Sequence, residues 1–298
     1  MTPKNAAQPR TSRNLNGWLF IGPSILLIGI FLVYPILRSL YLSFFTGRGM
    51  VQSFGGFDNF IRPWNDPVFL QALSNTTLFF VVQVPIMLTL AILLASLLDS
   101  DRLRFVGFFR MALFLPCVAS LVAYSVLFKS MFATDGVVNA ALLAAGIIGA
   151  PIGWLTDPFW AKVLVILAIT WRWTGYNMIF YLAALQNIDR SIYEAARLDG
   201  VPAWARFLYI TVPMMKPVIL FTTIVSTVGT IQLFDEVYNL TEGRGGPANA
   251  TMTLSLYIYN LTFRYMPNYG YAATVSYVIV LMVALLSYIQ FRLARDRS

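Results

Sequence analysis

The stretch EAARLDGVPAWARFLYITVP occupies residues 194–213 and is a polar insert between two apolar segments. Ser191 and Glu194 have the S-x-x-E spacing of a capping box, which predicts a helix that begins at Ser191. Gly200 suits the left-handed residue that commonly ends such a helix. The sequence therefore predicts a short helix followed by a sharp turn.

A second short helix is expected after this turn. Pro202 lies where proline is tolerated, in the first turn of that helix, and Pro213 limits its length. Two short helices bent against each other would form a projection that fits a socket on another protein. The alternative is a solvated connector that happens to be helical. Local signals alone do not separate these interpretations, because capping boxes are common.

The composition indicates a membrane protein. Of the 298 residues, 58% are hydrophobic and only 11% are charged, whereas a soluble domain has about 25% charged residues. Several uncharged runs reach the roughly 20 residues that a helix needs to cross a bilayer.

The same composition argues against several kinds of chemistry. His is absent, which removes the commonest metal ligand and general base, and the single Cys117 allows neither an intrachain disulfide nor a cysteine metal site. The sequence has no G-x-x-x-x-G-K-[ST] loop, so ATP that drives transport would have to bind a separate subunit. We therefore expect a chain without enzyme activity, metal or cofactor of its own.

The uncharged runs predict an all-α integral membrane protein with six transmembrane helices, the third of them kinked at Pro116. The expected spans are residues 14–37, a segment of 68–98 that starts near Asn75, 111–128, about 159–185, about 217–239 and 269–291. Loops are expected between them at 46–68, 99–110 and 240–267.

Residues 136–156 form an uncharged run that could be taken for a seventh span. Gly146, Gly149, Pro151 and Gly153 break any continuous helix there, so we expect a short external helix over about 137–146. The basic residues support this choice. With both termini inside the cell, thirteen of the 21 Lys and Arg lie on the cytoplasmic side and four lie outside, as the positive-inside rule expects. The net charge of +8 thus reflects topology, and no nucleic-acid partner is expected.

The polar insert resembles the cytoplasmic EAA loop of the membrane subunits of binding-protein-dependent ABC importers. The matching positions are Glu194, Ala195, Ala196, Asp199, Gly200, Phe207, Ile210 and Pro213. This resemblance implies the type I ABC importer permease fold and a loop that docks in a groove of the ATPase subunit. It extends to the Leu182–Ile188 lead-in and to Leu240–Pro247, which is similar to an external LT-x-GGP segment with two additional residues.

These flanking segments are similar to the first of two paired permeases in the maltose, lactose and glycerol-phosphate branch. The resemblance implies a translocation pathway for a di- or oligosaccharide, such as lactose or a maltose-like sugar, or for glycerol-phosphate. It also implies a second homologous permease, two ATPase subunits that bind ATP and magnesium, and an extracytoplasmic sugar-binding protein. The expected location is the bacterial cytoplasmic (inner) membrane, with several passes through the lipid bilayer.

Polar groups inside a bilayer are expensive and point to function. In the fourth and fifth spans the candidates are Arg172, Thr174, Tyr176, Asn177, Thr227, Thr230, Gln232 and Asp235. The resemblance carries sugar contacts onto Thr174, Gly175, Met178, Gln232 and Leu233, and Gly175 would let a sugar approach the backbone. Met178 and Leu233 depart from the more polar or aromatic residues of the relative, which leaves the substrate open.

Each of these candidates has a structural alternative. Arg172 lies between two tryptophans and could be a cation–π or snorkelling residue, and Thr227 and Thr230 could bond their own helix. Asp235 and Glu236 could lie hydrated at the external rim.

The competing function is a stand-alone secondary sugar transporter, which should carry an inverted repeat and a buried carboxylate relay. We find no acidic residue away from the ends of the expected spans, so the sequence favours the ABC importer. The predicted organisation is a cytoplasmic arm at 1–16, a first helix and external loop at 17–66, a core of five helices at 67–292 that contains the coupling loop at 187–213, and a cytoplasmic tail at 293–298.

Overall fold

The structure, a computed structural model, describes residues 10–49, 51–99 and 103–295. The expected tail beyond residue 295 and the first nine residues of the expected arm lie outside this part of the chain. The remainder of the expected arm, residues 10–16, is helical, because helix α1 already begins at Arg10.

Four helical segments of the described chain are long and apolar enough to cross a membrane. They are Gly17–Ser43, Pro67–Leu98, Pro158–Gln186 and Tyr269–Arg295. The first consists of α1 (Arg10–Ile28) from Gly17 onward, the π-helical turn η1 (Gly29–Val33) and α2 (Tyr34–Ser43), and the others are α4, α8 and α15. The sixth expected span is confirmed, because helix α15 begins at its first residue, Tyr269. Helix α4 begins at Pro67, earlier than the start near Asn75 that was expected, because Asp66 caps it.

The third expected span is a broken pair of helices. Helix α5 (Val106–Val118) and helix α6 (Leu121–Met131) meet at an angle of 101°. The expected kink at Pro116 is wrong in position, because α5 runs through the proline and the break falls at Ala119 and Ser120, which both have extended backbones. Proline removes one helical hydrogen bond, but the chain remains helical until these two residues leave the helical region.

The fifth span is also bent. Helix α10 (Ala203–Arg206), η3 (Phe207–Thr211) and α11 (Val212–Met214) lead into α12 (Lys216–Ile231) through a 71° bend. Helix α12 ends eight residues before the expected end at residue 239. Residues 232–234 separate it from the short helix α13 (Asp235–Thr241). The residues of this break line the cavity described below.

Shorter elements fill the connections. The loop expected at 46–68 contains an antiparallel hairpin, in which Phe45 pairs with Phe54 and Arg48 with Val51. Helix α7 (Val137–Ala144) confirms that a short helix forms within the predicted range 137–146, and no candidate span is found there in the described chain. The remaining elements are β1 (Phe45–Arg48), β2 (Val51–Phe54), α3 (Asp58–Ile61), η2 (Arg62–Asn65), α9 (Arg190–Leu198), η4 (Pro247–Asn249), α14 (Leu254–Tyr259) and η5 (Asn260–Arg264).

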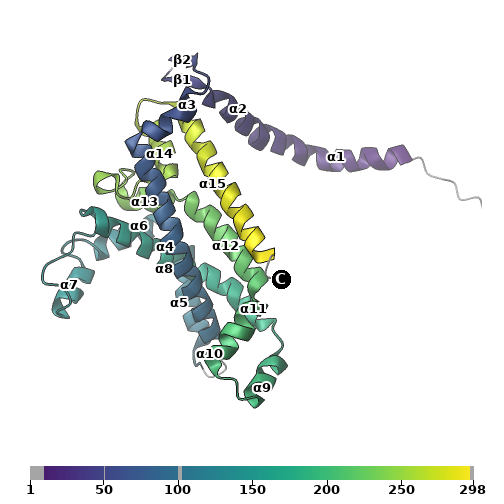
Figure 1. Ribbon diagram of the computed structural model, residues 1–298, viewed down its shortest axis with the longest axis vertical. Helices are drawn as coiled ribbons and strands as arrows, with labels where there is room; N and C mark the ends of the chain where they lie inside the picture. Colours follow the sequence, from purple (N-terminus) through teal and green to yellow (C-terminus); the bar gives the residue numbers. More distant parts are fainter. Residues whose placement is uncertain (1–9, 50, 100–102, 296–298) are drawn as a thin grey trace, which may run out of the picture.

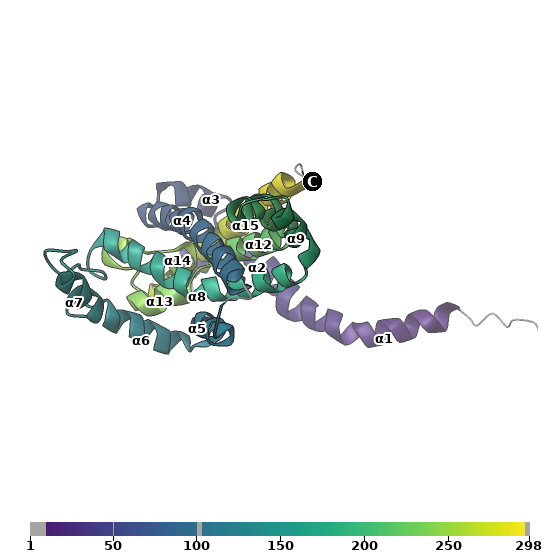
Figure 2. The same ribbon diagram turned by 90° about the horizontal axis from the view of Figure 1, so that it is seen from below.

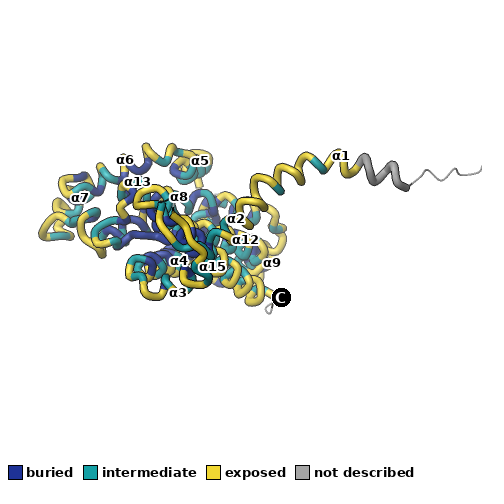
Figure 3. The backbone as a smooth tube through the Cα atoms, turned by 90° about the horizontal axis from the view of Figure 1, so that it is seen from above, coloured by how far each residue is buried: buried dark blue, intermediate teal, exposed yellow. Residues whose placement is uncertain are grey.

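Helices α4, α8, α12 and α15 form the body of the molecule, and α1 extends away from it (Figures 1 and 2). Colouring by burial shows that α1 is almost entirely exposed from Gly17 onward, while the dark, buried backbone is concentrated in the bundle (Figure 3). The helix α9 lies at the opposite end of the bundle from the β-hairpin (Figure 1).

Two apolar clusters make up the core. One contains Phe79 of α4 and Ile169 of α8 and extends toward α14 and α15. The other contains Val84 of α4 and Met178 of α8 and extends toward Met215, at the end that carries α9. Between the two clusters, α4, α8 and α12 each contribute buried polar residues, and this polar layer positions the candidate site.

Candidate substrate cavity and coupling loop

A cavity of about 430 Å³ lies between α4, α8, α12 and the connection to α13. Its size falls within the range of roughly 300–1,000 Å³ that is common for small-molecule sites. The lining combines amides, hydroxyls, two carboxylates and aromatic rings: Gln83, Met87, Ile169, Trp173, Tyr176, Asn177, Val225, Ser226, Gly229, Thr230, Gln232, Leu233, Phe234, Asp235 and Glu236. Amides and carboxylates can bond sugar hydroxyls, and aromatic rings can stack on a sugar face.

The polar floor of this cavity is a set of side chains bonded across helices. Thr230 Oγ1 donates to Gln83 Oε1 at 3.1 Å, which joins α12 to α4. Ser226 Oγ donates to Asn177 Oδ1 at 3.5 Å, which joins α12 to α8. Gln83 and Asn177 are almost fully buried, so the layer is held away from lipid and faces the cavity.

A buried ion pair lies at the α13 side of the cavity. Glu236 Oε1 accepts a 2.9 Å hydrogen bond from the Trp173 indole and lies 3.8 Å from Arg172 Nε. The guanidinium carbon of Arg172 is 5.2 Å from the ring centre of Tyr124 in α6. The alternative of a cation–π role for Arg172 is therefore confirmed. Glu236 is not hydrated at the rim, because only 6% of it is exposed.

Six of the eleven candidates named in the fourth and fifth spans line the cavity. They are Tyr176, Asn177, Thr230, Gln232, Leu233 and Asp235. Tyr176, Asn177 and Thr230 come from the helices α8 and α12. Gln232 and Leu233 lie at the break between α12 and α13, and Asp235 is the first residue of α13. The structure thus brings these residues from two separate spans to one space.

Three further candidates, which the resemblance named as sugar contacts, also lie elsewhere. A Cβ at Gly175 would be 1.9 Å from the carbonyl oxygen of Leu113, so this glycine allows α5 to pack closely against α8. Thr174 bonds the carbonyl of Thr170 at 2.5 Å and, with Gly175, lines an apolar hollow beside α5. Met178 is fully buried in the second core cluster. The expectation that Gly175 gives a sugar access to the backbone is therefore wrong for this chain, because α5 occupies that space.

The predicted helix–turn–helix is present in the polar insert. The start of α9 differs from the predicted capping box, because the Asp189 carboxylate caps the helix by accepting from the Ser191 N–H at 2.9 Å. The backbone N–H and then the hydroxyl of Ser191 hold the pKa of the exposed Asp189 carboxyl below its usual value of 3.8. A carboxylate is preferred at this position because it also faces the positive end of the helix dipole.

The end of α9 is a Schellman turn around Gly200. The Gly200 N–H donates to the Arg197 carbonyl at 3.1 Å, and the Val201 N–H donates to the Ala196 carbonyl at 3.0 Å. Gly200 has φ +71°, which confirms the predicted left-handed residue.

The second arm of the loop begins one residue later than expected. Pro202 has an extended backbone and precedes α10, and Arg206 Nη1 donates to the Val201 carbonyl at 2.7 Å. Helical structure continues past Pro213 to Met214, so this proline does not end the arm. The hydroxyls of Tyr193 and Thr211 lie 3.0 Å apart and join the two arms into one unit.

The eight matched positions of this loop divide into a buried contact and an exposed face. Ala196 is buried where the arms meet, and Phe207 and Ile210 are half-buried. Glu194, Ala195, Asp199, Gly200 and Pro213 are exposed. Around them, large apolar side chains also face outward: Leu198 is 90% exposed, Tyr209 72% and Trp204 63%. Exposed apolar groups gathered in this way are typical of protein–protein or membrane interaction sites.

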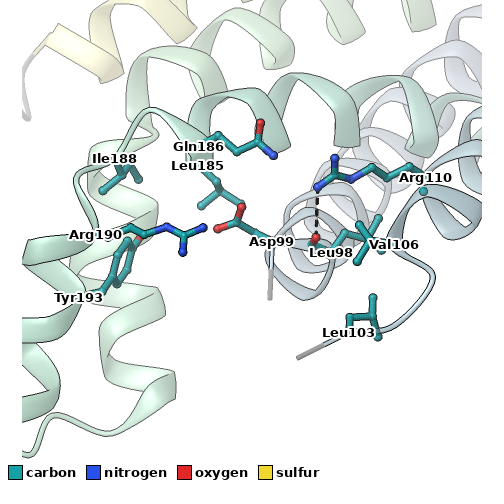
Figure 4. Close-up of a pocket in the computed structure, with 11 residues that line it drawn as sticks. Leu98, Asp99, Leu103, Val106, Arg110, Leu185, Gln186, Ile188, Arg190 and Tyr193 are labelled. Atoms are coloured by element: carbon teal, nitrogen blue, oxygen red, sulfur yellow. Dashed lines mark hydrogen bonds between the residues drawn. The ribbon is translucent and has the colours of Figure 1, made fainter. Parts of the chain in front are cut away.

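A second hollow lies where this loop meets the rest of the bundle. Figure 4 shows the Arg190 guanidinium and the Asp99 carboxylate pointing toward one another across it. Arg110 Nη2 donates to the Leu98 carbonyl at 3.4 Å on the far side (Figure 4). The base of α9 and the ends of α4 and α5 therefore line one hollow.

The family model for binding-protein-dependent transport system inner membrane components matches residues 18–296. The chain belongs to this family. It is a multi-pass inner membrane protein, and the bent pairs α5–α6 and α10–α12 count as one span each, which gives six.

The chain is similar to known permeases over nearly its whole length. It is 72% identical to the lactose transport system permease protein LacF of Rhizobium radiobacter, over 96% of each chain. It is 31% identical to the arabinooligosaccharides transport system permease protein AraP of Bacillus subtilis (strain 168), over 95% of this chain and 90% of that one. A crystal structure of a bacterial ABC transporter involved in alginate import has a chain that superimposes with a TM-score of 0.82, at 23% identity and 96% coverage of both. This permease therefore has the type I ABC importer fold.

Sequence reasoning missed part of the permease's cavity. Gln83 and Met87 of α4, Ser226 and Gly229 of α12 and the buried position of Glu236 were not singled out. Gln83 could have been found, because it is an amide in the middle of an uncharged apolar run, where polar groups are expensive. The other residues carry no such signal, since Ser, Gly and Met are ordinary in membrane helices.

Proposed function

We propose that this chain forms the translocation pathway of an ATP-driven importer for a neutral di- or oligosaccharide, with lactose as the first substrate to test. The 72% identity to a lactose permease over 96% of both chains supports the sugar. The chemistry of the cavity supports the neutral class of substrate.

The charges around the cavity favour a neutral over an anionic substrate. Asp235 and Glu236 line it, and no lysine or arginine does so in the part of the chain that the structure describes. The nearby Arg172 is turned to Glu236 and Tyr124. A phosphate group would meet carboxylates without a compensating cation, which is unfavourable in a desolvated site. A neutral sugar would instead find the amides of Asn177 and Gln232 and the rings of Trp173, Tyr176 and Phe234. Glycerol-phosphate is therefore the weaker candidate.

The coupling role belongs to the polar insert. In this proposal the unit formed by α9 and α10 enters a groove of an ATPase subunit, which binds ATP and magnesium, while this chain has no ATPase site of its own. The exposed Leu198, Trp204 and Tyr209 supply the apolar contact, and Glu194 and Asp199 supply a charged rim. A second permease, a second ATPase copy and an external sugar-binding protein complete the importer. A solved relative of the same fold is described in complex with a periplasmic protein that holds an alginate pentasaccharide.

The test is sugar uptake in bacteria that carry or lack this gene. Deletion should abolish uptake of radiolabelled lactose, and expression of the chain should restore it. An excess of unlabelled lactose should compete, whereas glycerol-phosphate should not. Uptake of lactose that is unchanged by the deletion would contradict the proposed substrate.

A further inference from the structure

The sulfur of Met87 occupies an unusual position at the floor of the cavity. It accepts a hydrogen bond from the Gln83 amide, with Nε2 and Sδ 3.1 Å apart. The Asn177 amide also points to it, with Nδ2 and Sδ 3.7 Å apart. The exposed fractions are 0% for Gln83, 2% for Met87 and 3% for Asn177. Two buried amide donors therefore converge on one thioether.

A thioether is a weak hydrogen-bond acceptor, so this arrangement leaves the amides poorly satisfied. The Gln83 oxygen is already used by Thr230, and the Asn177 oxygen by Ser226, at 3.1 and 3.5 Å. These bonds fix which way both amides face, so that their N–H groups are directed at the sulfur. Asn177 also donates to the Trp173 carbonyl at 3.0 Å. The N–H groups of Gln83, in contrast, have no acceptor within the described chain other than the Met87 sulfur. A hydroxyl oxygen at the position of the sulfur would be a better partner.

Met87 also lies at a boundary. It lines the cavity, and it belongs to the apolar cluster with Met178, Tyr181 and Met215 that fills the bundle toward the coupling loop. Methionine is unbranched and flexible, so its side chain can leave one site and fill another at low energetic cost. Displacement of Met87 from the amides would loosen the packing between the cavity and the loop end of the bundle.

We propose that the Gln83 amide, with Asn177, forms a hydroxyl-binding site on the sugar path, and that the Met87 sulfur fills this site until a sugar hydroxyl displaces it. The inference rests on the proposed function, and it adds α4 to the helices that recognise the substrate. It makes Gln83 a specificity-determining residue. Met87 becomes the element that connects occupancy of the cavity to the packing below it.

The test is a double-mutant cycle in the complete transporter, with sugar-loaded binding protein as the varied ligand. Met87→Leu keeps the volume and removes the acceptor, which destabilises only the empty state, so the half-saturating concentration should fall about two- to fivefold. Gln83→Leu should raise it by up to about tenfold, the loss of one neutral hydrogen bond. In the Gln83→Leu background only the 3.7 Å Asn177 contact with the sulfur remains, so Met87→Leu should have a clearly smaller effect. Equal effects of Met87→Leu in both backgrounds would show that Met87 acts by packing alone, and would overturn the proposal.

A second measurement distinguishes a role of Gln83 in sugar recognition from a purely structural role. Uptake of lactose is compared with uptake of a series of monodeoxy lactoses, each delivered by the same binding protein. Gln83→Leu should lower the preference for lactose over one analogue by up to about tenfold and leave the other ratios unchanged. Ratios that are all unchanged would refute the proposed role of Gln83. Gln83→Met, which keeps the unbranched shape, replaces Gln83→Leu if the complex assembles poorly.

The chain offers a matched control. The Asn260 amide points to the sulfur of the buried Met252 at 3.7 Å, outside the cavity. Met252→Leu removes a similar contact and should change neither the half-saturating concentration nor the sugar ratios. If wild-type transporter does not import lactose at all, the proposed substrate is wrong, and the cycle is carried out with the sugar that it does import. A wrong substrate and a wrong assignment of the Gln83–Met87 site therefore give different results.

Discussion

Gly200 makes the bend of the coupling loop possible, because its φ of +71° is strained for residues with a side chain. A Cβ at this position would meet no atom within 4 Å, so the effect of a substitution is confined to the backbone. Gly200→Val should cost about 1–2 kcal/mol and leave the protein able to accumulate. We expect it to tilt α10 and to lose ATP hydrolysis or its coupling to uptake, measured in membrane vesicles.

The control at this site is Gly200→Asn, because asparagine tolerates the left-handed region. It should retain most uptake. If Gly200→Val also keeps wild-type uptake with the ATPase bound, the loop is only a connector, and the docking role assigned to it is wrong.

The pair Arg172–Glu236 holds α8, α13 and α6 together at the cavity wall. Both side chains are about nine-tenths buried, and Arg172 Nε and Nη1 have no hydrogen-bond partner among the described residues. Removing one partner of a buried pair typically costs about 3–5 kcal/mol, because the other charge is left uncompensated. Glu236→Gln should therefore lower the Tm of the purified protein strongly. Adding Arg172→Met should recover part of this loss.

The matched control is Glu242→Gln in the exposed pair Lys129–Glu242, whose atoms are 3.1 Å apart. Exposed pairs contribute little to stability, so the Tm should hardly change. A Tm that is equally insensitive to Glu236→Gln would show that the buried pair does not hold these helices together.

At the scale of elements, Asp66 ties the start of α4 to two later segments. Its carboxylate accepts from the N–H groups of Val68 and Phe69 and from the hydroxyls of Tyr257 and Tyr271, the latter at 2.8 Å. Burial acts to raise the pKa of Asp66, but the hydrogen bonds from Tyr257, Tyr271 and the two backbone groups outweigh it and leave the pKa below 3.8. The cap thus favours the charged form.

This lowered pKa predicts how stability depends on external pH. A carboxyl with a lower pKa in the folded protein stabilises the fold above its unfolded pKa, and this contribution disappears as the pH falls through the folded value. Asp66→Asn should therefore lower the Tm near neutral pH, and the difference from wild type should shrink below 3.8. Thermal unfolding from about pH 7 to about pH 3 measures this difference. A constant difference over that range would contradict the assignment.

The long helices could be predicted from the sequence because hydrophobic runs of fixed length report directly on the bilayer. Helix α8 was expected over about 159–185 and occupies 158–186. The breaks were not predictable in the same way. Hydropathy is nearly uniform across Ala119 and Ser120, so the 101° turn between α5 and α6 leaves no trace in it. Pro116 pointed to a distortion in this span but not to its position.

The site was predictable in part for a related reason. A span that carries several polar residues is easily recognised, which led to Asn177, Thr230 and Gln232. The face of such a span that lines the cavity depends on how the other helices pack, which the sequence does not show. Gly175, for example, allows close contact with α5. Gln83 is the one polar residue between Thr77 and Thr89, and only the approach of α12 brings it to the cavity.

At the scale of the whole molecule, the topology places the loop of α9 and α10 on the cytoplasmic side and the segment around Ala248 outside. Both Ala203 and Ala248 are exposed, so cysteines placed there should react with reagents. After Cys117 is replaced by serine, Ala203→Cys should label only from the cytoplasmic side and Ala248→Cys only from outside. Labelling of Ala203→Cys from outside would contradict both the six-span topology and the docking role of the loop.

The most direct test of the central claim is transport by the purified chain with its partner subunits in proteoliposomes. The lumen of these vesicles contains no nucleotide, and each ATPase subunit faces the bath, where ATP and magnesium are supplied. Vesicles preloaded with the sugar-binding protein and lactose should then release lactose to the bath. Release should require hydrolysable ATP together with the binding protein, and ion gradients should have no effect. Lactose movement that follows an imposed ion gradient without ATP would contradict the importer assignment and favour a secondary transporter.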